Sequence, residues 1–151
     1  MSTIIICLDL SNNSEKILLQ AIKIAKKNQA KLHILAVIEG SHKNLLFGSV
    51  AISNQKHLRM QKQLKKLIDN VCASNNILPT MSVREGEIVE EITKEVGIFN
   101  DCKLLIFGKS EKSQSDNVVL PKIVGRVGNK IMAPIMVIPY NIAEDFMLEV
   151  A

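Results

Sequence analysis

Short apolar runs alternate along this chain with segments in which apolar residues recur every three or four positions. Runs rich in Ile, Leu and Val occupy residues 3–8, 31–38, 103–107 and 134–139, and a shorter run occupies residues 79–84. Their length and continuity are typical of strands that are buried on both faces of a parallel sheet. The pattern therefore predicts five strands.

The segments between these runs have helical spacing. A first helix is predicted around Ile17 to Ala25, and three more over residues 54–74, 87–97 and 118–131. Residues 39–53 are expected to form a long connection instead. Strands that alternate with helices predict an α/β fold, in which a parallel sheet is built by right-handed crossovers.

Composition is consistent with one aliphatic core. Of the 151 residues, 47% are apolar and only 3% are aromatic, which predicts a single domain packed mainly by Ile, Leu and Val. No apolar run is long enough to span a bilayer, and the first run has no basic segment before it, so no signal peptide is expected.

Net charge and cysteine content limit the expected binding partners and the expected cellular location. The formal net charge is +4, but the lysines are spread along the helices and few aromatic residues are available to stack on bases, so nucleic acid is not an expected partner. The three cysteines, Cys7, Cys72 and Cys102, have neither disulfide-framework nor zinc spacing. A cytoplasmic location is therefore expected.

Common catalytic and phosphate-binding motifs are missing. The turn after the first strand reads DLSNNS, without the glycines of a dinucleotide fingerprint, and no P-loop pattern occurs. His33, His42 and His57 have no metal-ligand spacing, and no nucleophile can be grouped with a base. Gly125 and Gly128 are interpreted as small residues that permit close helix packing. The sequence thus predicts no catalytic residue and no metal site.

The polar segment after Phe107 is the predicted location of any ligand site. In an open parallel sheet, ligands bind outside the carboxyl ends of the strands, at the point where the strand order reverses. Here a buried strand ends at Gly108 and is followed by a polar segment and a helix.

Five segments, taken in order, resemble the universal stress protein family: IIICLDLSNNSEKIL, KLHILAVIE, VREGEIVEEI, KLLIFGKS and APIMVIP. The resemblance covers residues 3–139. It implies a Rossmann-like, adenine nucleotide alpha hydrolase-like fold with five parallel strands in the order 3-2-1-4-5. Residues 1–139 would form this domain and residues 140–151 a C-terminal tail. It also implies a cytoplasmic protein with a role in stress response or regulation.

The family resemblance further implies a homodimer that pairs its last strands. In this chain that strand runs from Pro134 to Pro139, and an apolar strand at a sheet edge needs cover. A charge at Met136 or Ile138 is expected to weaken the dimer if those side chains face the partner.

Nucleotide-binding members of the family carry the motif G-x2-G-x9-G-[S/T] after the fourth strand. Its glycines let backbone N–H groups approach a triphosphate ahead of a helix. Placed on this chain, the motif matches Gly108 but then meets Glu111, Pro121 and Lys122. Glu111 adds negative charge, and Pro121 has no N–H to donate. The ATP motif is therefore degenerate.

Other family contacts are retained. Asp9 matches the acid near the adenosine, and Val37 matches the residue whose backbone contacts adenine. Lysines are suitable phosphate ligands, and the candidate nucleotide-binding residues are Asp9, Val37, Gly108, Lys109, Ser110 and Lys122. The alternative is structural: Asp9 caps a turn, Val37 belongs to the core, and the lysines are solvated.

Three functional hypotheses remain. The first is a non-enzymatic regulatory homodimer without a cofactor. The second is an adenine-nucleotide-binding member, for ATP or AMP, with slow ATP hydrolysis. The third is an adaptor that holds another protein through residues 45–47 (Leu45 to Phe47) or through the tail.

Overall fold

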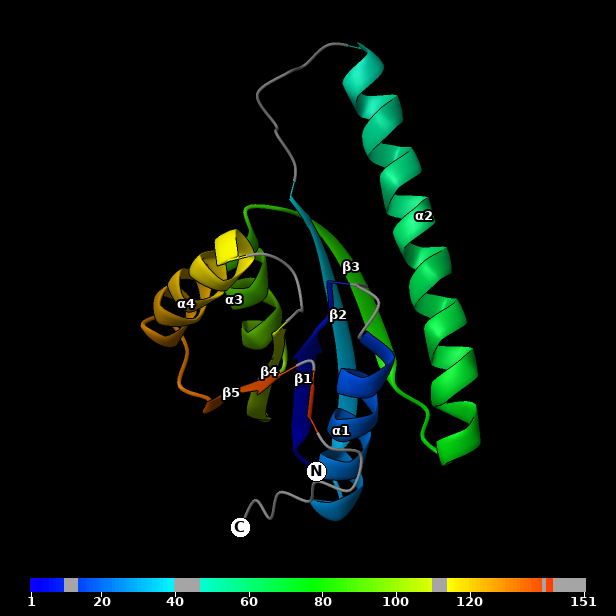
Figure 1. Ribbon diagram of the computed structural model, residues 1–151, viewed down its shortest axis with the longest axis vertical. Helices are drawn as coiled ribbons and strands as arrows, with labels where there is room; N and C mark the ends of the chain where they lie inside the picture. Colours follow the sequence, from blue (N-terminus) through cyan, green and yellow to red (C-terminus); the bar gives the residue numbers. More distant parts are fainter. Residues whose placement is uncertain (10–13, 40–46, 110–113, 140, 143–151) are drawn as a thin grey trace.

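The computed structural model describes residues 1–9, 14–39, 47–109, 114–139 and 141–142, with the backbone alone for residues 47–53 and 114–119. Strands and helices alternate along the chain (Figure 1). In order, the elements are β1 (Thr3–Cys7), α1 (Ser14–Lys27), β2 (Lys31–Glu39), α2 (Phe47–Val71), the 3-10 helix η1 (Ala73–Asn75), β3 (Thr80–Gly86), α3 (Ile88–Ile98), β4 (Cys102–Lys109), α4 (Gln114–Gly128) and β5 (Ile135–Pro139).

The five strands form one sheet in the order β3-β2-β1-β4-β5. Each neighbouring pair is parallel, so the predicted fold class and strand order are confirmed. The chain first builds outward from β1 through β2 to β3 and then crosses to the other side of β1 to build β4 and β5. The strand order therefore reverses between β1 and β4, where ligands bind in sheets of this kind.

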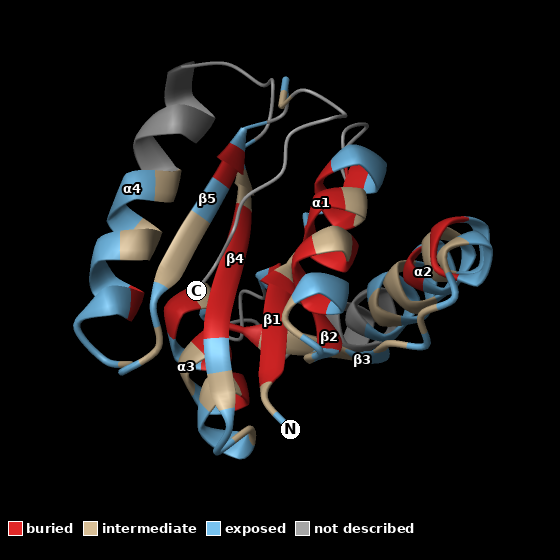
Figure 2. Ribbon diagram, turned by 90° about the horizontal axis from the view of Figure 1, so that it is seen from below, coloured by how far each residue is buried: buried red, intermediate tan, exposed pale blue. Residues whose placement is uncertain are grey.

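Helices cover both faces of the sheet. Helices α1 and α2 lie on one side, and α3 and α4 lie on the other (Figures 1 and 2). Ile4 and Ile6 of β1 belong to the same core cluster as Leu18 of α1 and Leu64 of α2. Ile5 points to the opposite face, into the cluster that α3 and α4 contribute to. Because both faces of β1 are covered, its sequence is apolar without alternation.

Helix α2 is longer than its sequence pattern predicts. It begins at Phe47, so the long connection expected over residues 39–53 is wrong for its second half. The first two turns contain Gly48 and several β-branched or short polar residues, which have low helix propensity, and propensity alone favoured a loop. Residues 45 and 46, part of the suggested adaptor segment, lie outside the described residues.

Two further expectations are corrected. Helix α4 begins at Gln114, four residues before its predicted start at 118, because its first turn is polar and lacks apolar periodicity. A Cβ at Gly125 would meet no atom of the described residues within 4 Å, so the close packing predicted there is wrong, whereas a Cβ at Gly128 would lie 3.7 Å from Cδ1 of Ile135. Among the helices of the described segments, none combines the length and apolar character needed to cross a bilayer.

Candidate functional site

The carboxyl ends of the three adjacent strands β2, β1 and β4 place candidate residues at the same edge of the sheet. In the parallel register, the last residue of β1 lies beside Leu35 of β2 and Phe107 of β4. Two residues further along each chain segment are Asp9, Val37 and Lys109. Residues that are separated by up to a hundred positions in sequence therefore lie at the same edge of the sheet, where the strand order reverses.

The side chains at this edge differ in exposure. Asp9 and Lys109 are exposed, whereas Val37 is half-buried. The Val37 side chain packs against the core cluster on the α3 and α4 face. Its side chain therefore has the packing role that was one of the two interpretations of this residue, and only its backbone is available to contact a ligand.

Gly108 lies where β4 and α1 pack closely against each other. A Cβ at this position would lie 2.5 Å from Cδ1 and 3.2 Å from Cγ2 of Ile17. Ile17 belongs to the second turn of α1 and is 2% exposed. The close approach of helix and strand explains this glycine without reference to a ligand.

Ser14 contributes a polar group that the sequence patterns did not single out. It is the first residue of α1 and is 3% exposed. Its hydroxyl is buried and makes no hydrogen bond within the described part of the chain. A buried hydroxyl without a partner is unfavourable by about 1–3 kcal/mol, and such groups commonly bind water or a ligand. The available signal was a serine three residues before Ile17, where the helical apolar pattern begins.

The three cysteine thiols are not suited to act as nucleophiles. His33 is buried and is not available as a base at this edge of the sheet. Burial raises the pKa of the Cys7 thiol at the end of β1, and it also raises the pKa of Cys72 and Cys102. These thiols stay protonated at neutral pH. His33 is 3% exposed, with Nδ1 2.7 Å from Thr80 Oγ1 and Nε2 3.1 Å from Glu95 Oε2.

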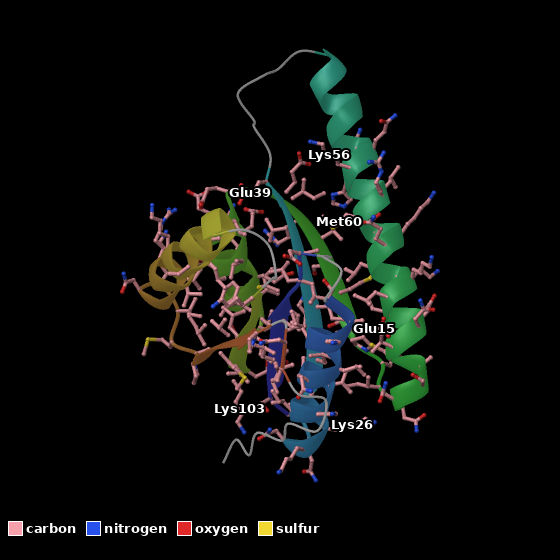
Figure 3. The ribbon with its side chains drawn as sticks, in the orientation of Figure 1. Glu15, Lys26, Glu39, Lys56, Met60 and Lys103 are labelled. Atoms are coloured by element: carbon pink, nitrogen blue, oxygen red, sulfur yellow. The ribbon has the colours of Figure 1, made fainter. Side chains whose placement is uncertain are left out.

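Charged side chains lie at both ends of the sheet. Glu39 at the end of β2 and Glu15 at the beginning of α1 lie toward the carboxyl edge, whereas Lys26 and Lys103 lie at the opposite end (Figure 3). Within the ranges that the structure describes, no group of three or more His, Cys, Asp or Glu side chains is placed to hold a metal ion.

A model of the universal stress protein family matches residues 1–139. The chain belongs to this family. The resemblance noted in the sequence is thus confirmed over the whole sheet, from β1 to the end of β5. No curated protein sequence matches the chain.

Solved structures of universal stress proteins share the fold. UspA from Lactobacillus plantarum has a TM-score of 0.74 at 18% identity, covering 91% of this chain and 97% of its own. A universal stress protein in complex with cAMP has a TM-score of 0.60 at 18% identity, with 93% and 98% covered. One from Archaeoglobus fulgidus in complex with dAMP has a TM-score of 0.54 at 12% identity, with 91% and 98% covered.

Two of the four positions of the nucleotide motif, Pro121 and Lys122, fall on helix α4 in this chain. Strand β4 ends at Lys109 and α4 begins at Gln114. Pro121 lies inside that helix, and both Pro121 and Lys122 are exposed. Lys122 is eight residues beyond the first residue of α4, about 12 Å along its axis.

Four of the candidate residues thus lie at the carboxyl edge: Asp9, Val37, Gly108 and Lys109. Lys122 is carried by the helix that follows. Ser110 and Glu111 lie outside the described residues.

Proposed function

We propose that this chain is a regulatory universal stress protein that catalyses no reaction and does not hold the triphosphate of ATP. The observation that carries the proposal is the position of α4. Its helical backbone already spans the residues that occupy the third glycine and the hydroxyl position of the nucleotide motif, Pro121 and Lys122.

A phosphate site needs backbone N–H groups that are free to point at the ligand. Pro121 has no N–H. In the interior of an α-helix, the N–H of residue 122 donates to the carbonyl oxygen four residues earlier. Neither motif position therefore offers a backbone N–H to a phosphate.

Electrostatics at the carboxyl edge also oppose a triphosphate. Asp9 follows β1, and Glu39 ends the neighbouring strand β2. Both are exposed. Like charges at this edge raise the free energy of a bound polyanion.

Native mass spectrometry of the purified full chain, followed by titration with ATP, ADP and AMP, tests the proposal. We expect no retained ATP, no release of phosphate on prolonged incubation with ATP, and no tighter binding of ATP than of AMP. ATP that survives dialysis, or an affinity that rises with each added phosphate, would contradict it.

A second candidate function, binding of an adenosine monophosphate, is favoured by the other half of the site. Asp9, Val37 and Gly108 match the family contacts to adenosine and lie at the ends of adjacent strands. The unpartnered hydroxyl of Ser14 offers a hydrogen bond nearby in the chain. The relatives solved with cAMP and dAMP hold nucleotides with one phosphate.

Titration of AMP and cAMP into Asp9→Ala tests this candidate. Loss of a hydrogen bond to a carboxylate should weaken binding by about tenfold or more. Asp69→Ala, which removes an exposed carboxylate from α2, is the matched control and should bind as the unaltered chain does. Equal affinity of both variants would exclude Asp9 from the site.

We also propose that the protein forms a homodimer through β5. This strand is the last in the sheet, so its outer N–H and C=O groups are open to pairing. Val137 is 40% exposed, whereas Ile138 is 2% exposed and belongs to the core. A charge at Ile138 would therefore disrupt the fold, and Met136 also packs against the core cluster. Val137 is the residue that faces outward.

A further inference from the structure

The outer side of α1 carries a hollow whose lining includes none of the candidate nucleotide-binding residues. Its volume is about 300 Å³, and it is lined by Lys16, Leu19, Gln20, Lys23 and Ile142. Leu19 and Ile142 are half-buried and pack against the core. Lys16 and Lys23 are seven residues apart, a spacing that places them two turns apart on the same side of the helix. The hollow thus combines an apolar floor with two cations.

The chain itself returns to this hollow after the last strand. Beyond β5, the N–H of Ile142 donates to the carbonyl oxygen of Pro139 over 3.2 Å, which reverses the chain direction. Ile142 then lines the hollow and joins the core cluster that includes Ile17 and Leu18. The described part of the chain therefore ends at the hollow.

The composition of the following segment complements the hollow. Residues 143–151 read AEDFMLEVA, in which the acids Glu144 and Asp145 precede the apolar residues Phe146, Met147 and Leu148. An apolar group next to carboxylates matches an apolar floor next to lysines.

The segment is also long enough. Lys16 and Lys23 are about 10 Å apart along the helix axis, and three extended residues cover about that distance. A short tether gives an effective concentration in the millimolar range, so weak contacts suffice to keep such a segment bound.

We propose that residues 143–151 dock into this hollow, with Phe146 on Leu19 and with Glu144 and Asp145 beside Lys16 and Lys23. The occupant is the chain's own C-terminal segment. Docking makes the outer side of α1 unavailable to any other acidic and apolar peptide, so the segment acts as an internal competitor for that surface.

The test uses the full chain carrying Phe146→Trp. Because the chain contains no other tryptophan, its fluorescence reports on this position alone. A docked segment gives a blue-shifted emission and protection from acrylamide quenching. Two exposed ion pairs together contribute up to about 1 kcal/mol, so reversing Lys16 and Lys23 to Glu should lower the docked-to-undocked ratio about fivefold.

Reversing the other partners separates docking from a damaged fold. Glu144→Lys with Asp145→Lys leaves α1 intact and should lower the ratio to a similar extent, and all four changes together should restore it. Lys62→Glu with Lys65→Glu, which places the same charge change on exposed positions of α2, should leave the emission unchanged.

Three results would overturn the proposal. The first is a solvent-exposed tryptophan in the unaltered background. The second is equal protection in the hollow variants and in the α2 control. The third is protection that disappears on dilution in step with dissociation of a dimer, because a second copy would then supply the segment.

Discussion

Gly108 decides how closely α1 packs on β4, and this contact gives a first prediction. Gly108→Ala would place a methyl group 2.5 Å from Ile17 Cδ1. Overpacking of this kind costs about 1–3 kcal/mol, so we expect the free energy of unfolding in urea to fall by that amount. Ile17→Val removes Cδ1 and should recover most of the loss when the two changes are combined.

The matched control is Gly125→Ala in α4. Its added methyl group would meet nothing within 4 Å, and alanine has the higher helix propensity, so stability should rise by up to about 1 kcal/mol. If Ile17→Val leaves the cost of Gly108→Ala unchanged, contact with Ile17 is not the reason for the glycine.

Glu87 is a helix cap whose effect depends on pH. Its carboxylate accepts a hydrogen bond of 2.9 Å from the N–H of Glu90, which lowers the pKa of Glu87, with smaller contributions from Arg126 and Lys130. A pKa lowered by folding adds stability above the unfolded value, about 4.3, and this stability is lost as the pH falls through the folded value. Glu87→Ala should therefore cost about 1 kcal/mol at pH 7 and much less at pH 3.

Thermal unfolding at both pH values measures this difference. Glu90→Ala removes a neighbouring exposed carboxylate from the first turn of the same helix and serves as the control. Its smaller cost reflects only the helix dipole. An equal cost of Glu87→Ala at pH 7 and pH 3 would show that the carboxylate does not act as a cap.

At the scale of elements, a buried polar network connects helix α3 to the neighbouring strands β2 and β3. Glu95 of α3 contacts His33 of β2 at 3.1 Å and Arg84 of β3 at 3.4 Å, and Arg84 also contacts Glu91 at 3.2 Å. Burial alone would raise the pKa of Glu91, but hydrogen bonds from Lys94 and Arg84 lower it overall. The network satisfies carboxylates that would otherwise be buried at high cost.

Removing one member of this network should lower the stability of the protein substantially. Glu95 is 2% exposed, and removing one partner of a buried pair costs about 3–5 kcal/mol. We expect Glu95→Leu to lower the free energy of unfolding by about 3 kcal/mol and to cost less in a His33→Leu background. Glu90→Leu, an exposed position on the same helix, is the control. Additive costs at positions 33 and 95 would mean that the pair is not coupled.

The strands and helices were predicted from the sequence more completely than the contacts between them. Apolar runs and helical periodicity predicted all five strands and a parallel sheet, because strands buried on both faces are apolar throughout. The strand order was implied by the family resemblance, and the structure has that order. The contact between His33 and Glu95 spans 62 residues and leaves no local pattern, so the sequence assigned His33 no partner. The start of α2 at Phe47 was missed because its first turns have weak propensity.

The candidate site was likewise predicted in part: the positions of its residues were predicted, but the contacts between them were not. Strand ends are visible in sequence, so Asp9, Val37 and Gly108 could be assigned to one edge of the sheet. The contact between Gly108 and Ile17 and the unpartnered hydroxyl of Ser14 depend on how α1 is placed over that edge. Such placement is a property of packing between elements and not of any one segment.

At the scale of the whole molecule, the open edge of the sheet gives the last prediction. The sheet ends at β5, and an edge strand with an exposed apolar residue favours pairing with another chain. Val137→Glu would place like charges near each other across a two-fold axis while leaving the core residue Ile138 in place. We expect this variant to be a monomer by multi-angle light scattering at concentrations where the unaltered chain is a dimer.

Met132→Glu separates an edge effect from a general effect of charge. Met132 is fully exposed and precedes β5, so its replacement should leave the dimer intact. Because the dimer would bury the outer groups of β5, its loss should also make that strand more open to amide hydrogen exchange, while β1 in the centre of the sheet stays protected. A monomeric unaltered chain would refute pairing through β5, and a dimeric Val137→Glu variant would place the interface on another surface.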